Sequence, residues 1–247
     1  MALWNEIRGL LGGLAGDGGA LAALLERVRT LFAGDEQTRR RVAFSVALIA
    51  LSAKMAKADG VVSPSEVEAF KSIFEVPDRE MANVARLYNL AKQDVAGFDA
   101  YAERVRALFP GGEDDQAVLE DVLDALFHIA RADGVLHEDE TWFLRQTAQR
   151  FGLSEERFEQ ILARNGDAPA ANPYAVLEAS PDWDLDRLRR QYRRLAAAHH
   201  PDRMIARGVP AEFVAMANER LAAINVAWET IEARMQPERQ RMASQNA

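Results

Sequence analysis

The most constraining feature of this sequence is a proline-containing tripeptide, His200-Pro201-Asp202, that separates two long amphipathic patterns. Before the tripeptide, apolar residues recur at helical spacing: Leu185, Leu188, Tyr192 and Leu195. After it, a second stripe recurs every three or four residues: Phe213, Ala217, Leu221, Ile224, Trp228 and Ile231. Pro201 prevents the first helix from continuing past His199. The pattern therefore predicts two antiparallel helices joined by a loop, an αα-hairpin.

The first of these helices also carries a stripe of arginine. Arg187, Arg190 and Arg194 share one face, and Arg190, Arg193 and Arg194 lie nearest the tripeptide. From Pro173 onward 11 arginines stand against 10 carboxylates, so the formal net charge of −8 comes from the preceding residues. This acidic body argues against nonspecific binding to nucleic acid. The arginine cluster instead favours an acidic protein partner.

The segments around the tripeptide resemble the J-domain of the DnaJ co-chaperone family. The matching segments are Asn172–Leu177, a short first helix, then Tyr192–Ala196, His199–Arg203 and Ile224–Ile231. A bare His-Pro-Asp is weakly specific, but all of these segments occur in the expected order. The run from His200 to Pro210 is more similar to the DjlA type of this family, which places the J-domain at the C-terminus.

This resemblance implies a co-chaperone that binds a DnaK-type chaperone and stimulates its ATP hydrolysis. The chain itself is therefore not expected to be an enzyme. The residues implied to contact the partner are His200, Pro201, Asp202, Arg187, Arg190, Arg193 and Arg194. Asp202 is implied to accept hydrogen bonds from a basic residue of the partner. The residues expected to hold the hairpin together are Leu188, Tyr192, Leu195, Leu221, Ile224 and Trp228.

An internal repeat precedes the hairpin, in which Ala56–Glu66 matches Ala130–Glu140. Both copies contain Ala-Asp-Gly-Val and are typical of a helix end, a glycine turn and a helix start. The paired signature resembles the TerB (tellurite-resistance) helical domain, which DjlA-type chaperones carry before the J-domain. Four acidic residues of the two turns are candidate oxygen ligands for a divalent cation: Asp59, Glu66, Asp133 and Glu140.

Two interpretations of these acidic residues compete. The turns lack the alternating acidic residues that an EF-hand needs before its glycine. Aspartate before a turn glycine and glutamate in a first helical turn are ordinary choices for capping and for the helix dipole. The structural role is therefore preferred over the cation, and no other cofactor is expected.

The whole chain is predicted to be all-α, because apolar stripes at helical spacing recur throughout and alternating strand patterns are missing. The predicted organisation is a glycine-rich amphipathic leader over residues 1–34, a TerB-like helical domain over 35–164, a linker over 165–172 and a J-domain over 173–247. Residues 165–172 are rich in helix-breaking and small residues, which marks this segment as the linker. The absence of cysteine fits a reducing compartment.

The location of the protein depends on the leader. Residues 1–32 lack the continuous apolar run of about 20 residues that a membrane span needs. DjlA-type proteins carry an N-terminal anchor, and the chain departs from them here. We expect a cytoplasmic bacterial protein whose leader is mobile or loosely docked, with peripheral contact at the inner membrane as the alternative.

The chain lacks the Gly/Phe-rich segment and the cysteine-rich zinc module of general-purpose DnaJ proteins. The recognition of its client proteins, which the sequence does not name, is therefore assigned to the acidic helical domain or the leader. We predict that this domain is an interaction or localisation module. The alternative is a TerB-type protein that senses metal or envelope stress, with the J-domain as its effector.

Overall fold

The computed structural model describes residues 6–9, 20–31, 35–58, 68, 78–93, 98–109, 111–165, 172–210 and 213–245. All regular structure in these ranges is helical, which confirms the all-α prediction. The helices are α2 (Ala20–Leu31), α3 (Glu36–Ala58), η1 (Asp78–Glu80), α5 (Met81–Gln93), α6 (Phe98–Ala107), α7 (Glu113–Ala130), α8 (Glu138–Phe151), α9 (Glu155–Asn165), α10 (Pro173–Val176), α11 (Leu185–Ala198), α12 (Pro201–Ala206) and α13 (Val214–Gln245).

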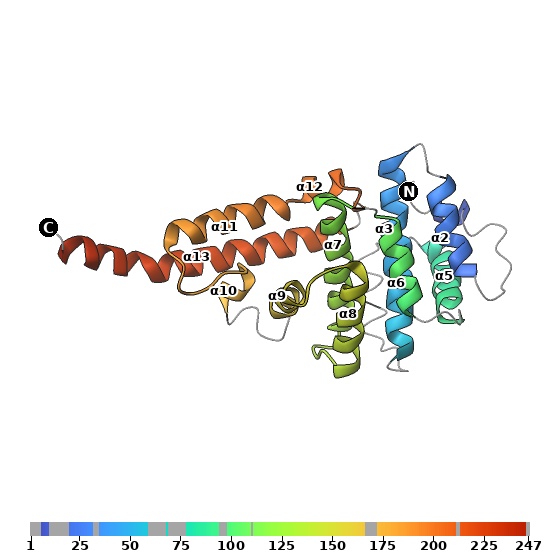
Figure 1. The fold of residues 1–247 in the computed structure, drawn as a ribbon, viewed down its shortest axis with the longest axis horizontal. Coiled ribbons are helices and arrows are strands. Elements are labelled where there is room, and N and C mark those ends of the chain that lie inside the picture. Colours follow the sequence, from blue (N-terminus) through green and yellow to red (C-terminus); the bar gives the residue numbers. More distant parts are fainter. Residues whose placement is uncertain are drawn as a thin grey trace.

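Helix α3 is the centre of the N-terminal unit. Its residues from Val42 to Met55 are nearly all apolar and all buried, because a helix that is apolar on almost every side must be covered on all of them. It packs against α5, α6 and α7, and Figure 1 shows it between the α2–α5 side of the unit and the α7–α8 side. None of the helices that the structure describes has the length and apolar character of a membrane span.

The described part of the predicted leader is docked on this unit. Ile7, Leu24 and Val28 are buried and belong to the same core as α3. Leu24 and Val28 are four residues apart on α2, so they lie on one face of that helix. The leader is therefore not loosely docked at these described positions, because Ile7, Leu24 and Val28 complete the core.

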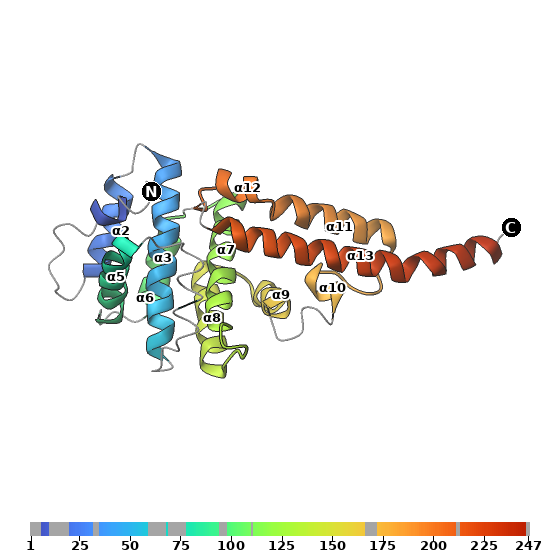
Figure 2. The same ribbon diagram turned by 180° about the vertical axis from the view of Figure 1, so that it is seen from behind.

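Helices α11 and α13 form an antiparallel hairpin with α10 beside it, which projects from the N-terminal unit (Figures 1 and 2). The hairpin has an apolar core of its own, built from α10, α11 and α13. This agrees with the two amphipathic patterns in the sequence. In both views α13 extends beyond the end of α11 that lies farther from the N-terminal unit.

The other end of the hairpin is built into the N-terminal core. Met204, Val209, Phe213 and Ala217 belong to the same cluster of buried residues as α3. The rings of Phe213 and Phe44 meet edge to face with centroids 4.6 Å apart. The two units are thus joined by shared core packing as well as by the chain, which the predicted linker did not suggest.

A close backbone approach strengthens this junction. Gly208 has a φ of +95°, and a Cβ atom at this position would lie 2.5 Å from Cβ of Arg40 on α3. The side chain of Arg40 donates to the carbonyl oxygen of Arg207 at 3.4 Å. Only glycine permits both this backbone conformation and this approach.

Candidate protein-interaction site

Helix α11 begins and ends at signals that the sequence contains. The Asp184 side chain caps its N-terminus by accepting from the backbone N–H of Arg187 at 2.7 Å. The helix ends at Ala198, with His199 at its C-cap, as expected from the proline that follows two residues later. Leu185, Leu188 and Leu195 point into the hairpin, which leaves the arginines on the outer faces.

The tripeptide His200-Pro201-Asp202 forms the start of a short helix. The predicted loop continues directly into α12, because Pro201 at the first helical position has a backbone φ suited to a helix start. The Nδ1 atom of His200 accepts from the backbone N–H of Asp202 at 3.2 Å and so caps α12. The side chain of Asp202 is 89% exposed, and its Oδ2 atom lies 3.7 Å from Nδ1 of His200.

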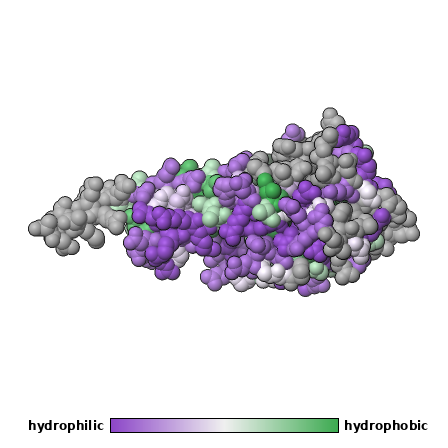
Figure 3. Space-filling view, turned by 90° about the horizontal axis from the view of Figure 1, so that it is seen from above, coloured by the Kyte–Doolittle hydropathy of each residue, from purple (hydrophilic) through white to green (hydrophobic). Residues whose placement is uncertain are grey.

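The arginines predicted to contact a partner are all exposed: Arg187, Arg190, Arg193 and Arg194. Arg187 stacks on the Trp183 ring at 3.9 Å, and Arg194 donates to Gln191 at 3.0 Å. Arg190 and Arg193 have no ion pair among the described residues. Figure 3 views the molecule from above, the side on which α11 and α12 lie in Figure 1, and shows a largely hydrophilic surface. A face of this kind suits an acidic protein surface.

Within the hairpin, the Tyr192 and Trp228 rings stack with centroids 5.1 Å apart, and the Tyr192 hydroxyl donates to Asn225 at 3.2 Å. Five of the six predicted core residues pack in the hairpin core: Leu188, Tyr192, Leu195, Ile224 and Trp228. The prediction for Leu221 is wrong, because this residue is only half-buried and lies outside the cluster. Leu221 is one turn closer than Ile224 to the α12 end, where the hairpin core gives way to the junction.

An ion-pair network at the junction was not predicted from the sequence. Its centre is Glu178, which follows α10 and has a φ of +49°. The Glu178 carboxylate accepts from Arg157 and Arg164 of α9, each at 2.6 Å, and lies 3.7 Å from Arg194 and from Arg220. Burial alone would raise the pKa of Glu178, but Arg164 and Arg157 outweigh it and lower this pKa.

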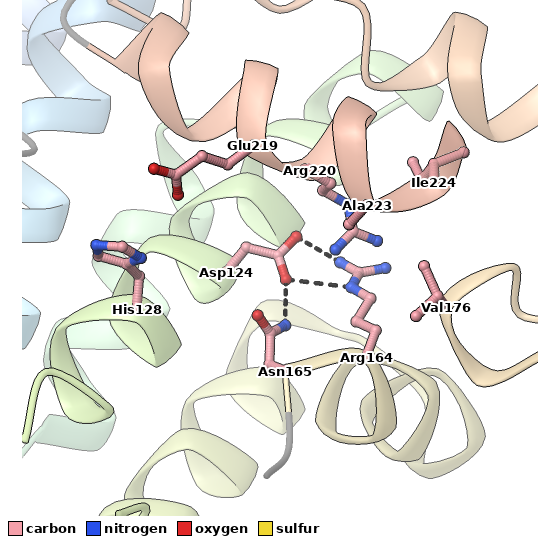
Figure 4. Close-up of a pocket in the computed structure, with 9 residues that line it drawn as sticks. All are labelled: Asp124, His128, Arg164, Asn165, Val176, Glu219, Arg220, Ala223 and Ile224. Carbon is pink, nitrogen blue, oxygen red and sulfur yellow. Dashed lines mark hydrogen bonds and ion pairs between the residues drawn. The ribbon is translucent and has the colours of Figure 1, made fainter. Parts of the chain in front are cut away.

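A second carboxylate extends the network to α7 (Figure 4). Asp124 accepts from Arg164 at 2.5 and 3.2 Å and from the Asn165 side chain at 2.6 Å. These groups line a cavity of about 180 Å³ together with Arg220 of α13. Burial and the neighbouring Arg164 lower the pKa of Arg220 to about 10. The network fixes the hairpin relative to α7 and α9.

The sequence contained a signal for this network. Arg157 and Arg164 are seven residues apart on one face of α9, and the same helix buries Phe158 and Ile161. Arginine beside such an apolar stripe indicates a buried partner of opposite charge. The signal does not identify Glu178, which is separated from α9 by the predicted linker.

The four candidate metal ligands fall into two groups. Asp59 and Glu66 lie outside the described residues. Asp133 accepts from the backbone N–H of Val135 at 3.0 Å, and Glu140 accepts from that of His137 at 2.9 Å. Both described carboxylates thus hold a turn and a helix start. No group of three or more His, Asp or Glu residues suited to a metal occurs among the described residues, and the four-residue cation site stays a prediction.

Comparison with known proteins places these features in a family context. Residues 45–163 match the family described as tellurite resistance protein TerB. The matched range covers α3 from residue 45 onward, α5 to α8 and most of α9, and it includes the second turn of the repeat. It ends at residue 163, just before Arg164 and the C-terminal hairpin.

Relatives named Co-chaperone protein DjlA match most of the chain. The protein from Vibrio parahaemolyticus is 26% identical, and the match covers 80% of each chain. The protein from Legionella pneumophila is 25% identical over 81% of this chain and 80% of its own. The protein from Escherichia coli K12 is 23% identical over 94% of this chain and 97% of its own. No solved structure gives a significant match.

Proposed function

We propose that this chain, a co-chaperone of the DjlA type, binds a DnaK-type chaperone and stimulates its ATP hydrolysis through His200-Pro201-Asp202. The observation that carries the proposal is the state of Asp202. Its carboxylate is 89% exposed, although its backbone is held at the start of α12 by Pro201 and by the His200 cap. A charged group on rigid backbone, with both oxygens open to solvent, is suited to accept charge-assisted hydrogen bonds from a partner.

The arginine face supplies the second part of this recognition. Arg190 and Arg193 lie on the helix that ends just before the tripeptide, and both are exposed. One partner surface can therefore meet both regions. Acidic groups on that surface would be attracted to α11, and the attraction would weaken as salt screens the charges.

The chemistry of this reaction belongs to the chaperone. A co-chaperone accelerates hydrolysis by binding the hydrolysis-competent state of the chaperone more tightly than its other states. Asp202 and the arginines would provide that difference in affinity. The N-terminal helical unit is proposed as an interaction or localisation module. The names of the relatives favour a co-chaperone over the metal- or stress-sensing alternative.

Binding to the two nucleotide states of a cognate DnaK-type chaperone tests this proposal. The full chain is expected to bind the ATP state at least about tenfold more tightly than the ADP state, a difference of about 1.4 kcal/mol. Asp202→Asn keeps the shape of the side chain and should remove most of that difference.

Asp139→Asn is the matched control, because Asp139 is an exposed aspartate in the first turn of α8. It should bind like the wild type. Equal affinity of the wild-type chain for both states would refute the proposal.

A further inference from the structure

A groove runs along the junction beside the tripeptide. One wall comes from α7 and carries Glu113, Asp114 and Glu120. The opposite wall comes from α11 and α12 and includes Arg194 and Arg203. The groove encloses about 680 Å³. Because Arg203 directly follows Asp202, this space adjoins the proposed partner site.

The two walls carry opposite charges, and only some of them pair: Arg207, at the end of α12, lies 3.4 Å from Asp114 of α7, but one exposed charge on each wall has no such partner among the described residues. Glu113 and Arg203 are both exposed, and no ion pair is found for either among the described residues. Arg157 lines the groove and bonds both Glu120 of α7 and Glu178 of the hairpin, which fixes the two sides relative to each other. Glu113 on α7 and Arg203 on α12 therefore remain available to a charged ligand.

Three polar side chains at the base of the groove are almost fully buried. Asp121, His199 and Arg207 line it and are only 5%, 6% and 7% exposed. Arg207 forms ion pairs with Asp121 at 4.0 Å and with Asp114 at 3.4 Å. The Nδ1 atom of His199 has no hydrogen-bond partner in the described chain. A buried polar group without a hydrogen bond is costly, and a ligand that supplies the missing donor or acceptor offsets that cost.

The ionisation of these groups suits a neutral polar ligand. Burial lowers the pKa of His199 to about 2, so its ring is neutral at neutral pH. Burial and the adjacent Asp124 raise the pKa of Asp121 to about 7. The base of the groove therefore combines Arg207, which donates, with the His199 ring and the Asp121 carboxyl group, which can each donate or accept. A peptide backbone, which alternates N–H and C=O groups, matches such a base.

We propose that this groove binds an extended polypeptide segment of the DnaK-type partner, with an acidic side chain towards Arg203 and a basic one towards Glu113. The inference rests on the proposed function, since it assigns a second contact to the same partner. Continuity supports this occupant: His199 and Arg203 flank the tripeptide, so a chaperone bound at Asp202 lies next to the groove. The TerB-like unit then takes a direct part in recognising the chaperone.

Affinity measurements on the full chain with the ATP state of the chaperone test the two walls. Glu113→Gln and Arg203→Gln should each weaken binding about threefold to fivefold, the effect of one partly exposed ion pair. Glu138→Gln is the control for the first, because Glu138 is the first residue of α8 as Glu113 is of α7, and both are exposed. Arg234→Gln, at an exposed position of α13, is the control for the second. Both controls should bind like the wild type.

A photoreactive cross-linker provides a second readout that does not depend on affinity. Gln116 is an exposed residue of α7 that lines the groove. A cross-linker placed at this position should capture the purified chaperone. Gln149 is an exposed residue of α8 outside the groove lining. A cross-linker placed there should not capture the chaperone.

The outcomes separate the groove from the proposed function. Unchanged affinity of both wall variants, with no capture from position 116, would overturn the groove even if Asp202→Asn abolished binding. Tighter binding of Glu113→Gln would overturn it as well, because the acidic wall would then repel the chaperone. If the wild-type chain does not bind the chaperone at all, the proposed function and the groove fail together.

Discussion

The arginines of α9 and those of α11 serve opposite purposes in this protein. Arg157 and Arg164 of α9 are half-buried and buried, and both donate to the carboxylate of Glu178. Arg190 and Arg193 of α11 are exposed, and no ion pair holds them among the described residues. The same residue type thus fixes the two units together at one site and stays available to a partner at the other.

Burial explains this difference. A buried arginine has lost its water, so removing it leaves its carboxylate partners buried and unpaired, which is costly. An exposed arginine keeps its water, and its loss changes the folding free energy by little. The α9 arginines should therefore affect folding, whereas the α11 arginines should affect binding.

The largest expected effect is that of Arg164→Gln on folding. This change leaves Asp124 and Glu178 buried without their principal cation, and should lower the free energy of unfolding by about 3–5 kcal/mol. Urea unfolding of the full chain measures it. Arg193→Gln, the exposed counterpart, should change the same quantity by less than about 0.5 kcal/mol. Similar losses in the two variants would remove the distinction between the helices.

A smaller effect is expected at Asp121, a buried carboxyl on α7 whose nearest arginine, Arg207, lies 4.0 Å away. Its pKa is raised from 3.8 to about 7 in the folded protein. The folded state therefore holds this proton more tightly than the unfolded state, and stability is lost as the pH rises from about 4 through 7. Asp121→Asn cannot ionise, so it should be more stable than the wild type by about 2–4 kcal/mol at pH 8.

Urea unfolding at pH 4 and at pH 8 checks this prediction. The advantage of Asp121→Asn should shrink towards pH 4, where the carboxyl is protonated in the folded wild type and partly protonated in the unfolded chain. If the difference in free energy of unfolding between Asp121→Asn and the wild type did not depend on pH, the pKa of Asp121 would not be raised in the folded protein.

The smallest expected change in free energy concerns the exposed arginines. The double variant Arg190→Gln with Arg193→Gln should bind the ATP state of the chaperone about tenfold more weakly, since two exposed ion pairs contribute about 1.4 kcal/mol together. Its affinity should also depend less on salt than that of the wild type. Titrations at two salt concentrations measure both effects. An unchanged affinity would mean that α11 is only a solvated face.

The hairpin could be predicted from the sequence because the signals that define it are local. The apolar spacing, the Asp184 cap and the proline after α11 lie within the segments that they organise. The one misplaced core residue, Leu221, follows the same spacing as Ile224 and Trp228. The spacing of apolar residues identifies the apolar face of a helix. Tertiary packing decides which other element covers that face at each position along the helix.

The junction could not be predicted because its partners are far apart in the sequence. Glu178 meets arginines from α9 and α13, and Phe213 packs on Phe44 of α3. The predicted linker contains breakers and small residues, which gave no sign that the segments on either side share a core. The exposed tripeptide was predictable, whereas the groove beside it depends on how α7 and α11 pack.

The most direct test of the co-chaperone mechanism is the single-turnover ATPase rate of a cognate DnaK-type chaperone. The rate is measured alone, with the wild-type chain, and with the Asp202→Asn and Asp139→Asn variants. The wild type and Asp139→Asn are expected to accelerate hydrolysis equally, and Asp202→Asn to give nearly the basal rate. No acceleration by the folded wild-type chain, or equal acceleration by Asp202→Asn, would contradict the proposed role of the exposed carboxylate.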